Sequence, residues 1–237
     1  MSGFDNEIKI FNSLNNRYFN DLSDNFKKLI LKLNKETPLD KIICYKKGGI
    51  VKSDINIIID NNTFKMSIKK GTGNSVHQEE VEDFINYLKL NMINDEEVFN
   101  DIRHFIWGDN SLDGSGEIHD RLGVTDYKKL YPNKIQKIQD YFNEIKPDLI
   151  ERFVISGKNP DQKIDCLYYG DDNHGKLVLA EDLFNYLLNT ESKGTISVGR
   201  LSFQAWNRNI NGGIKSEKKR GQIQLKWGTL KNDIEYL

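Results

Sequence analysis

The 237-residue sequence lacks several features that define whole classes of protein. Its two cysteines, Cys44 and Cys166, can form neither a disulfide framework nor a zinc site, so we expect both to be small buried residues in a reducing compartment. No apolar run approaches the length of a membrane helix, and the first residues have neither the basic nor the apolar region of a signal peptide. These absences predict a globular, cytoplasmic protein.

The sequence also lacks an excess of charge of either sign and the common catalytic motifs. The net charge of −1 does not suggest nucleic-acid binding by the chain as a whole, so a binding surface would need segregated charge, which the C-terminal third contains. No glycine-rich loop matches a P-loop, and no Ser-His-Asp order stands out. The four histidines, His77, His104, His119 and His174, lack metal-ligand spacing.

Hydrophobic periodicity predicts the order of helices and strands. The expected helices cover 5–34 with a break near Asn15-Asn16, a segment burying Val81, Phe84, Ile85 and Leu88, 95–106, 125–151 with a break at Pro132, and 181–188. The expected strands cover 42–45, 152–156, 163–169 and 176–180, with a long hairpin over 194–208 and 221–227. Because helices give way to strands near residue 150, we expect two regions, 1–150 and 151–237.

Residues 50–80 contain the most informative pattern in the chain. Ile55, Ile57 and Ile59 alternate with polar residues, and so do Phe64, Met66 and Ile68, which is typical of two half-buried strands. Asn61-Asn62 is a plausible two-residue hairpin turn, because asparagine tolerates positive φ. That turn pairs Asp60 with Thr63 and therefore Ile57 with Met66. It also places Asp54 opposite Lys69, with Ser67 on the same face.

A carboxylate beside an ammonium at the end of a hairpin has two interpretations. Phosphodiester hydrolysis needs a divalent cation and a positive charge near the nucleophile, and Mg²⁺ prefers carboxylates, carbonyls and water, so Asp54, Ser67 and Lys69 fit such a site. The alternative is a surface ion pair that stabilises the hairpin by less than about 1 kcal/mol.

Ser53-Asp54, followed after twelve residues by Ser67-Ile68-Lys69, resembles the signature of the PD-(D/E)xK nuclease superfamily. The surrounding pattern resembles small type II restriction endonucleases with an SD…(E/S)xK variant. The resemblance implies an α/β fold, with a restriction-endonuclease-like mixed β-sheet core flanked by helices and a C-terminal β-rich DNA-recognition region. It also implies that Asp54 and the residue at position 67 bind metal, while Lys69 orients or activates water.

Two departures from the signature affect the metal site. Ser53 replaces the usual proline, which the family tolerates, and Ser67 replaces the acid, so its carbonyl or a water would have to serve. Glu7 and Gln78 are candidate auxiliaries of the catalytic site. For Gln78 the alternative is a capping box, Ser75-x-x-Gln78, that begins the next helix; for Glu7 it is a solvated charge in a first helical turn.

A loop over 107–117 partly imitates an EF-hand calcium loop. Asp109, Ser111, Asp113 and Glu117, with Asp120 at the twelfth place, give the spacing, but the third position is serine and no clear pair of helices flanks the loop. We favour an ordinary connector, or a loop that touches DNA or closes the active site.

The C-terminal hairpin is the candidate DNA-recognition element. Leu201, Phe203 and Ala205 are expected on one face, and residues suited to base edges on the other. The basic loop between the strands suits phosphates. The alternative is an exposed polar sheet face with a solvated basic loop. The candidate DNA-binding residues are Arg200, Ser202, Gln204, Trp206, Asn207, Arg208, Asn209, Lys218, Lys219, Arg220, Gln222 and Gln224.

Together these patterns predict a Mg²⁺-dependent, sequence-specific endonuclease acting on double-stranded DNA. The catalytic region would be 1–150 and the recognition region 151–237, with the protein either a monomer or a homodimer. Two other interpretations remain open. The protein could be a DNA-binding protein that has lost catalysis on a nuclease fold, with Ser67 marking the loss, or a protein-interaction module in which Asp54 and Lys69 form only an ion pair.

Overall fold

The computed structural model describes residues 3–46 and 51–237. Its contacts divide the chain into two units built from interleaved segments. Unit 1 comprises Met1–Asn74, Ile150–Tyr186 and Thr229–Leu237, and unit 2 comprises Ser75–Leu149 and Leu187–Gly228. One switch between the units falls at the predicted boundary near residue 150, but neither unit is a continuous half of the chain. The assignment of catalysis to 1–150 and recognition to 151–237 stays a prediction.

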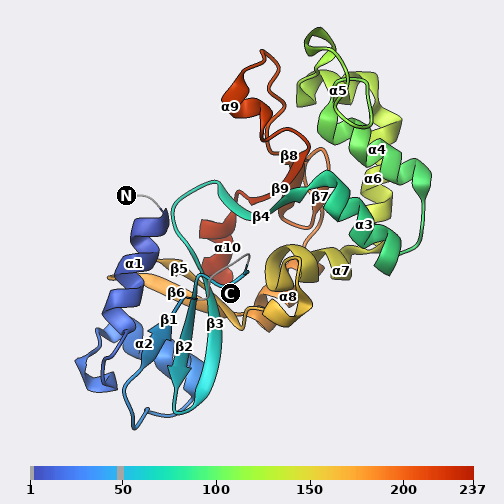
Figure 1. The fold of residues 1–237 in the computed structure, drawn as a ribbon. Coiled ribbons are helices and arrows are strands. Elements are labelled where there is room, and N and C mark those ends of the chain that lie inside the picture. The colour runs from blue at the N-terminus through green and yellow to red at the C-terminus, as the bar shows by residue number, and fades with distance from the viewer. Residues whose placement is uncertain (1–2, 47–50) are drawn as a thin grey trace. The chain divides into compact units, whose positions relative to one another are not determined.

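Unit 1 is built on a mixed sheet with strand order β1-β2-β3-β5-β6 (Figure 1). β3 and β5 run parallel, and the other neighbouring strands are antiparallel. The elements of this unit are α1 (Gly3–Leu14), η1 (Phe19–Asp21), α2 (Asp24–Asn34), β1 (Ile43–Tyr45), β2 (Ile55–Ile59), β3 (Asn62–Lys69), η3 (Glu151–Ser156), η4 (Pro160–Gln162), β5 (Cys166–Gly170), β6 (Gly175–Leu179), α10 (Leu230–Tyr236) and most of α8 (Ala180–Asn189).

The helices α1 and α2 pack on one face of this sheet. Ile10 and Leu14 from α1 join Phe26 and Ile30 from α2 in a buried cluster with the inward side chains of the strands. Those strand residues are Cys44, Ile55, Ile57, Ile59, Met66, Ile68, Cys166, Tyr168 and Leu177. The alternation predicted for the hairpin is therefore confirmed, and both cysteines are buried as expected.

The hairpin turn lies one residue earlier than predicted. Asp60 and Asn61 have φ of 45° and 71°, the positive values of a type I′ turn. Ile59 therefore pairs with Asn62, Ile57 with Phe64, and Ile55 with Met66. The predicted pairing of Asp60 with Thr63, and with it Asp54 opposite Lys69, is wrong by two residues. An even shift keeps each side chain on its predicted face, since the side-chain period of a strand is two.

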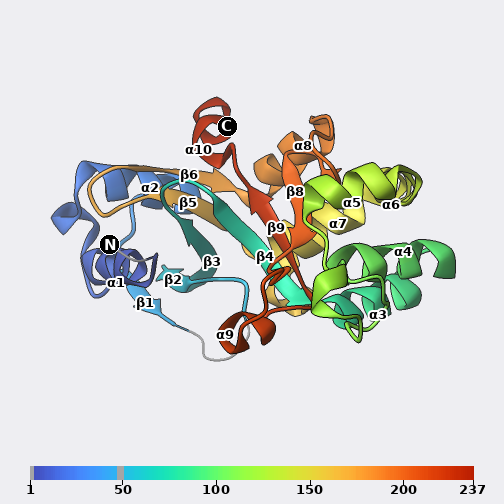
Figure 2. The ribbon, with the colours of Figure 1, turned by 90° about the horizontal axis from the view of Figure 1, so that it is seen from above.

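Unit 2 contains the second sheet, with strand order β4-β9-β8-β7, of which Figure 2 labels β4, β9 and β8. Its elements are β4 (Asn74–Glu80), which begins at the last residue of unit 1, α3 (Val81–Asn91), α4 (Glu96–Trp107), η2 (Ile118–Asp120), α5 (Val124–Leu130), α6 (Pro132–Glu144), most of α7 (Lys146–Ile150), β7 (Ser197–Val198), β8 (Leu201–Ala205), α9 (Ile214–Glu217) and β9 (Gln222–Trp227). Aromatic rings join its helices to the sheet, with Phe203 of β8 in contact with Phe84, Phe105 and Phe142.

Two segments differ in type from the prediction. Residues 152–156 form a buried π-helical turn and not a strand, because a short apolar run fits either a buried strand or a buried helix. Ser75 and Gln78 lie on β4 and do not cap a helix. The helix that follows begins at Val81, and its N-cap, Glu80, makes no side-chain capping bond.

The helix predicted over 95–106 is confirmed, with the Asp95 side chain accepting a hydrogen bond from the Val98 N–H as its N-cap. No helix among the described residues has the length and apolar character that crossing a bilayer requires.

Candidate active site and nucleic-acid interface

Asp54 lies immediately before β2, at the end of the sheet where β3 finishes. Its backbone N–H donates to the Met66 carbonyl, at 2.9 Å, which fixes the residue against β3. Its Oδ2 accepts hydrogen bonds from Ser67 Oγ, at 3.1 Å, and from the Ile68 N–H, at 2.5 Å. No described residue donates a hydrogen bond to Oδ1, and the side chain is 24% exposed. One carboxylate oxygen is therefore held by β3 while the other can bind an incoming group.

Lys69 lies close to Asp54 although the two are not cross-strand partners. Its Nζ is 3.8 Å from Asp54 Oδ2, so the predicted ion pair forms on a diagonal of the sheet, within reach of a long side chain. The neighbouring Lys70 pairs instead with Asp171, at 3.0 Å. Backbone N–H groups of His174 and Asn173 and the Lys70 ammonium hold the pKa of Asp171 at about 2. Of the two neighbouring lysines, Lys69 is therefore the one that faces Asp54.

Ser67 supports Asp54. The serine is buried, and its hydroxyl hydrogen is used in the bond to Asp54 Oδ2. Ser53, directly before Asp54, is buried too, and its hydroxyl donates to Asn56 Oδ1 at 2.9 Å. Both serines therefore stabilise the local geometry of the strand ends through hydrogen bonds.

The residues at this end of the sheet fit a magnesium ion that completes its shell with water and substrate. In the part of the chain that the structure describes, no three His, Cys, Asp or Glu side chains are close enough to share a metal ion. Among the described residues, Asp54 is the carboxylate that has an unbonded oxygen and lies beside Lys69. Mg²⁺ is commonly bound through one or two carboxylates plus waters and substrate phosphates, so a single carboxylate with an unbonded oxygen is compatible with such an ion.

Each of the two predicted auxiliaries has a partner within its own unit. Glu7, on α1, pairs with Lys46 at 3.2 Å. Lys46 follows Tyr45, which pairs with Asn56, so Glu7 lies at the same end of the sheet as Asp54. Gln78 is exposed on β4 in unit 2, where its Nε2 donates to Ser75 Oγ at 3.1 Å. The catalytic roles of both residues stay predictions.

The predicted faces of the C-terminal hairpin are present. Leu201, Phe203 and Ala205 are buried, whereas Ser202 and Gln204 are partly exposed. On β9, Gln222 is also partly exposed, but Gln224 is buried. Trp206 follows β8, with the Lys219 ammonium 4.3 Å from its ring centre, and Lys218 is exposed.

Two of the predicted DNA-contacting residues also have partners within the chain, and a third lies in a turn. Asn207 and Asn209 brace the loop, since Asn207 Nδ2 donates to the Ser216 carbonyl and Asn209 Nδ2 to Glu217. Arg200 lies in the tight turn between β7 and β8, where its Nε is buried with no acceptor among the described residues.

Arg208 and Arg220 are buried, which contradicts their predicted exposure. The Arg208 guanidinium lies over the Phe105 and Tyr127 rings, 4.8 and 5.6 Å from their centres, and burial lowers its pKa to about 10. Arg220 donates to Asp109 Oδ2 at 2.8 Å and to the Trp107 carbonyl at 3.1 Å. Strand alternation over 194–208 placed Arg208 on the polar face, but β8 ends at Ala205, so the alternation does not extend to that residue.

The loop over 107–117 is held in place by buried contacts. Burial opposes ionisation of Asp109, but hydrogen bonds from Arg220 and Ser111 hold its pKa below the usual value. The acidic residues are not gathered around a cation position. The Trp107 ring lies against Gly114 and Gly221, where a Cβ would come within 2.5 and 2.3 Å of it. The ring and the ion pair therefore fasten this loop to the start of β9.

Arg121, which was not among the predicted site residues, adds contacts to Glu217 and Asn209 in the segment between β8 and β9. Its guanidinium makes two hydrogen bonds to the Glu217 carboxylate, at 2.9 and 3.0 Å, and one to the Asn209 carbonyl. The hydrogen bonds from Arg121 hold the pKa of Glu217 below its usual value. A lone arginine in a loop has no periodic or motif signal, so no sequence pattern could have identified it.

The chain matches no protein-family model and no curated protein sequence. Among solved structures it is similar to restriction endonuclease MspI in complex with its cognate DNA. The TM-score is 0.54 at 17% sequence identity, and the similarity covers 85% of this chain and 76% of the MspI chain. At that identity the similarity shows the fold alone. With its mixed five-stranded sheet flanked by helices, the protein has a restriction-endonuclease-like fold.

Proposed function

We propose that the protein is a Mg²⁺-dependent endonuclease that cuts double-stranded DNA at a short specific sequence, as type II restriction enzymes do. The observation that carries the proposal is the contact set of Asp54, Ser67 and Lys69 at one end of the sheet in a restriction-endonuclease-like fold. The solved neighbour MspI was crystallised with its cognate DNA, which supports DNA as the substrate class.

Each residue of the site has a separate task in this proposal. Asp54 Oδ1 would hold the metal ion, and the hydrogen bonds from Ser67 Oγ and the Ile68 N–H to Oδ2 keep the carboxylate in one orientation. The ion would supply Lewis acidity at the scissile phosphate and lower the pKa of its bound water. Lys69 offers a positive charge for orienting the attacking water and for stabilising the developing charge on the phosphate. The expected products are 5′-phosphate and 3′-hydroxyl ends.

The test is digestion of unmethylated phage DNA with Mg²⁺, comparing wild type with Asp54→Ala and Lys69→Ala. We expect discrete bands from wild type. Either variant should lose about 10²-fold or more in cleavage rate and should still bind DNA. Lys70→Ala is the matched control, because Lys70 has the same charge but pairs with Asp171. Full activity in either site variant, or an equal loss in the control, would contradict the assignment.

A second candidate function is DNA binding without cleavage. The observation that favours it is the single carboxylate at the site, since Ser67 supplies no second one. Sequence-specific binding in gel shifts, with no cleavage under any divalent cation, would establish this function in place of the first. Absence of duplex binding at low salt would instead favour a protein-interaction module.

A further inference from the structure

Four polar side chains form a continuous chain of hydrogen bonds across three strands of unit 2. Gln204 on β8 lies directly opposite Gln224 on β9, and Gln204 Nε2 donates to Gln224 Oε1 at 3.1 Å. Gln224 Nε2 donates in turn to Ser75 Oγ on β4, at 3.3 Å. Gln78 Nε2, also on β4, donates to the same oxygen at 3.1 Å. We call Gln204, Gln224, Ser75 and Gln78 the amide row.

The direction of these bonds determines which atoms remain for a ligand. Gln224 is buried, with its amide oxygen and nitrogen both used inside the row. In their contacts with other described residues, Gln204 and Gln78 each use one N–H, which leaves each with a second N–H and a free carbonyl oxygen. Gln78 is exposed and Gln204 partly so. The row therefore presents two glutamine side chains, each with a donor and an acceptor, from its two ends.

Gln222, the other glutamine on β9, forms its hydrogen bond outside the amide row. Gln222 Nε2 donates to the Glu80 carboxylate at 2.6 Å. The backbone also ties this end of the sheet, since the Val81 N–H donates to the Gly221 carbonyl at 2.8 Å. These contacts fix β4 against β9, so the amide row lies on a firmly paired part of the sheet (Figure 2).

We propose that Gln78 and Gln204 are base-contacting residues of the DNA-recognition surface, and that Ser75 and Gln224 position them. The inference deepens the proposed function, because it assigns specificity at the surface of that enzyme, and it places Gln78 in recognition. A glutamine side chain with a free donor and acceptor matches the N7 and N6 edge of adenine in the major groove, and strands are among the elements that enter grooves. The row fixes both amides before DNA arrives, which reduces the ordering cost of binding.

The experiment selects preferred sites from a pool of random duplexes with Asp54→Ala protein, so that binding is measured without cleavage. We expect Gln78→Ala and Gln204→Ala each to relax base preference at a limited set of positions. The preferred base at those positions should lose about 5- to 150-fold in relative affinity. Gln136→Ala is the matched control, since Gln136 is an exposed glutamine that bonds Asp140 on α6.

The positioning role of Ser75 has its own test. Ser75→Ala should relax preference at the positions governed by Gln78 and Gln204 together, and Ser75→Thr, which keeps the hydroxyl, should restore both. A general loss of stability would not be rescued in that position-specific way. Unchanged preferences in both glutamine variants, or no preferred site for the parent protein, would overturn the inference. A preferred site that depends on the row, with no cleavage by the Asp54-containing protein, would support the inference while contradicting the proposed function.

Discussion

Ser67 is the residue in which this chain departs most from the family signature, and its contacts give it a supporting task. Because Ser67 Oγ donates to Asp54 Oδ2, the serine orients the carboxylate that would hold the metal. Groups that orient a metal ligand typically contribute about 10- to 100-fold in metal affinity or activity. We expect Ser67→Ala to lower cleavage by about that factor, measured as kcat/KM against Mg²⁺ concentration. A Ser67→Ala rate equal to wild type would show that the bond has no functional weight.

The buried ion pair of Arg220 and Asp109 gives a stability prediction. Both side chains are almost fully buried, and removing the Asp109 carboxylate leaves the Arg220 guanidinium with the Trp107 carbonyl and the more exposed Glu217 carboxylate as its acceptors in a medium of low dielectric constant. We expect Asp109→Ala to lower the free energy of unfolding by about 3–5 kcal/mol in urea titrations. Glu97→Ala removes an exposed pair with Lys137 and should cost less than about 1 kcal/mol. Equal losses in the two variants would contradict the importance of burial.

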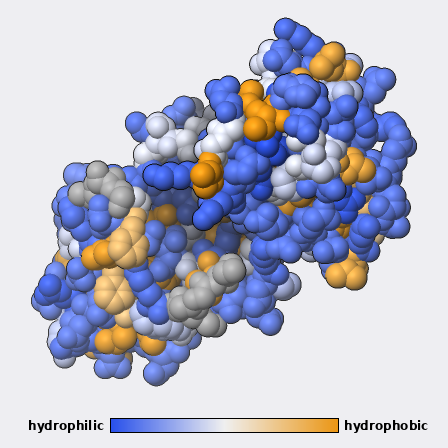
Figure 3. Space-filling model, turned by 45° about the horizontal axis from the view of Figure 1, so that its top comes forward, coloured by the Kyte–Doolittle hydropathy of each residue, from blue (hydrophilic) through white to orange (hydrophobic). Residues whose placement is uncertain are grey.

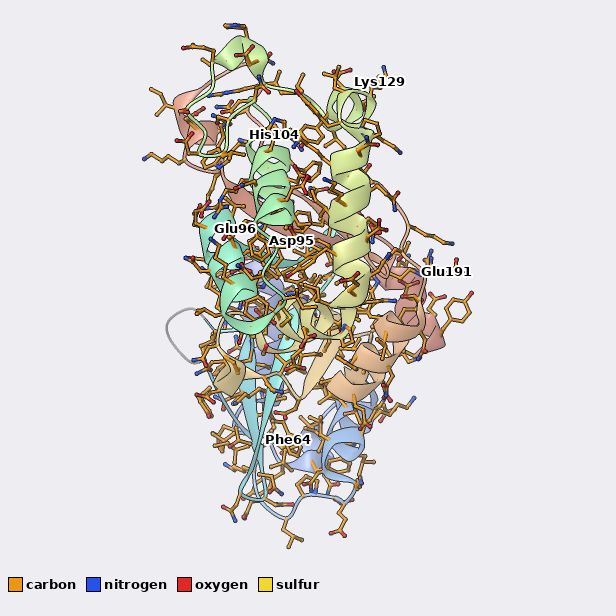
Figure 4. The ribbon with its side chains drawn as sticks, turned by 90° about the vertical axis from the view of Figure 1, so that its right-hand side faces the viewer. Phe64, Asp95, Glu96, His104, Lys129 and Glu191 are labelled. Atoms are coloured by element: carbon orange, nitrogen blue, oxygen red, sulfur yellow. The ribbon has the colours of Figure 1, made fainter. Side chains whose placement is uncertain are left out.

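His104 predicts how stability depends on pH. It lies on α4 (Figure 4), with Nδ1 2.7 Å from the Tyr127 hydroxyl, and burial lowers its pKa. The unfolded chain therefore binds more protons than the folded one between the lowered pKa and the usual value of about 6.5. Stability should fall as pH drops below about 6.5 and level off below the folded pKa.

The measurement for His104 is the free energy of unfolding between pH 7.5 and 5. His104→Gln, which cannot titrate, should show a shallower decline over that window than wild type. The exposed His119 provides the control, and His119→Gln should leave the slope unchanged. A His104→Gln slope as steep as that of wild type would contradict the assignment.

At the level of elements, the β2–β3 hairpin depends on one turn. Asp60 and Asn61 have positive φ, and the Asp60 carboxylate also accepts hydrogen bonds from the Leu39 N–H and from Asn34 Nδ2. A β-branched residue is strained in this conformation, so we expect Asn61→Val to destabilise the protein by about 1–2 kcal/mol. Asn62→Val is the control, because Asn62 is an exposed strand residue. Thermal unfolding measures both variants, and similar midpoints would show that the turn geometry is not limiting.

The sequence was sufficient to predict the hairpin faces but not its register. Period-two alternation identified the buried side of β2 and β3, since only that side packs on α1 and α2. The turn could not be located within one residue, because Asp60, Asn61 and Asn62 all tolerate turns. The position of the turn is fixed by hydrogen bonds to the Asp60 carboxylate from Leu39 and Asn34, which are more than 20 positions away in the sequence. Distant partners also explain why β4 was missed, since its neighbour β9 lies over 140 residues further along the chain.

For the candidate site, too, the shared face of the residues was predictable but the partners contributed by distant segments were not. Asp54, Ser67 and Lys69 are near one another because local alternation places them on one face. The burial of Arg208 and Arg220 was not predictable, because their partners come from α4 and from the loop that follows it. Figure 3 shows a largely hydrophilic surface in the view given.

At the level of the molecule, each of the two units is built from separate segments of the chain, and this interleaving predicts how fragments behave. A fragment ending at residue 150 would keep β3 but lose β5, its parallel partner, and would keep β4 but lose β9. We expect fragment 1–150 to lack cooperative unfolding and to show little protection in hydrogen exchange, with 151–237 behaving likewise. A mixture of the two fragments should regain protection in β3 and β5. Cooperative unfolding by the isolated 1–150 fragment would contradict this dependence.

The parallel pairing of β3 with β5 also has a consequence for protein synthesis. Met66 pairs with Cys166, so the sheet that carries Asp54 and Lys69 cannot be completed on the ribosome until β5 has emerged. Lys176, on the next strand, also donates to the Glu235 carbonyl near the last residue of the sequence. Bringing such distant segments together is slow compared with forming a hairpin. During translation, β3 would therefore remain without its parallel neighbour until the hundred residues from Met66 to Cys166 have been added.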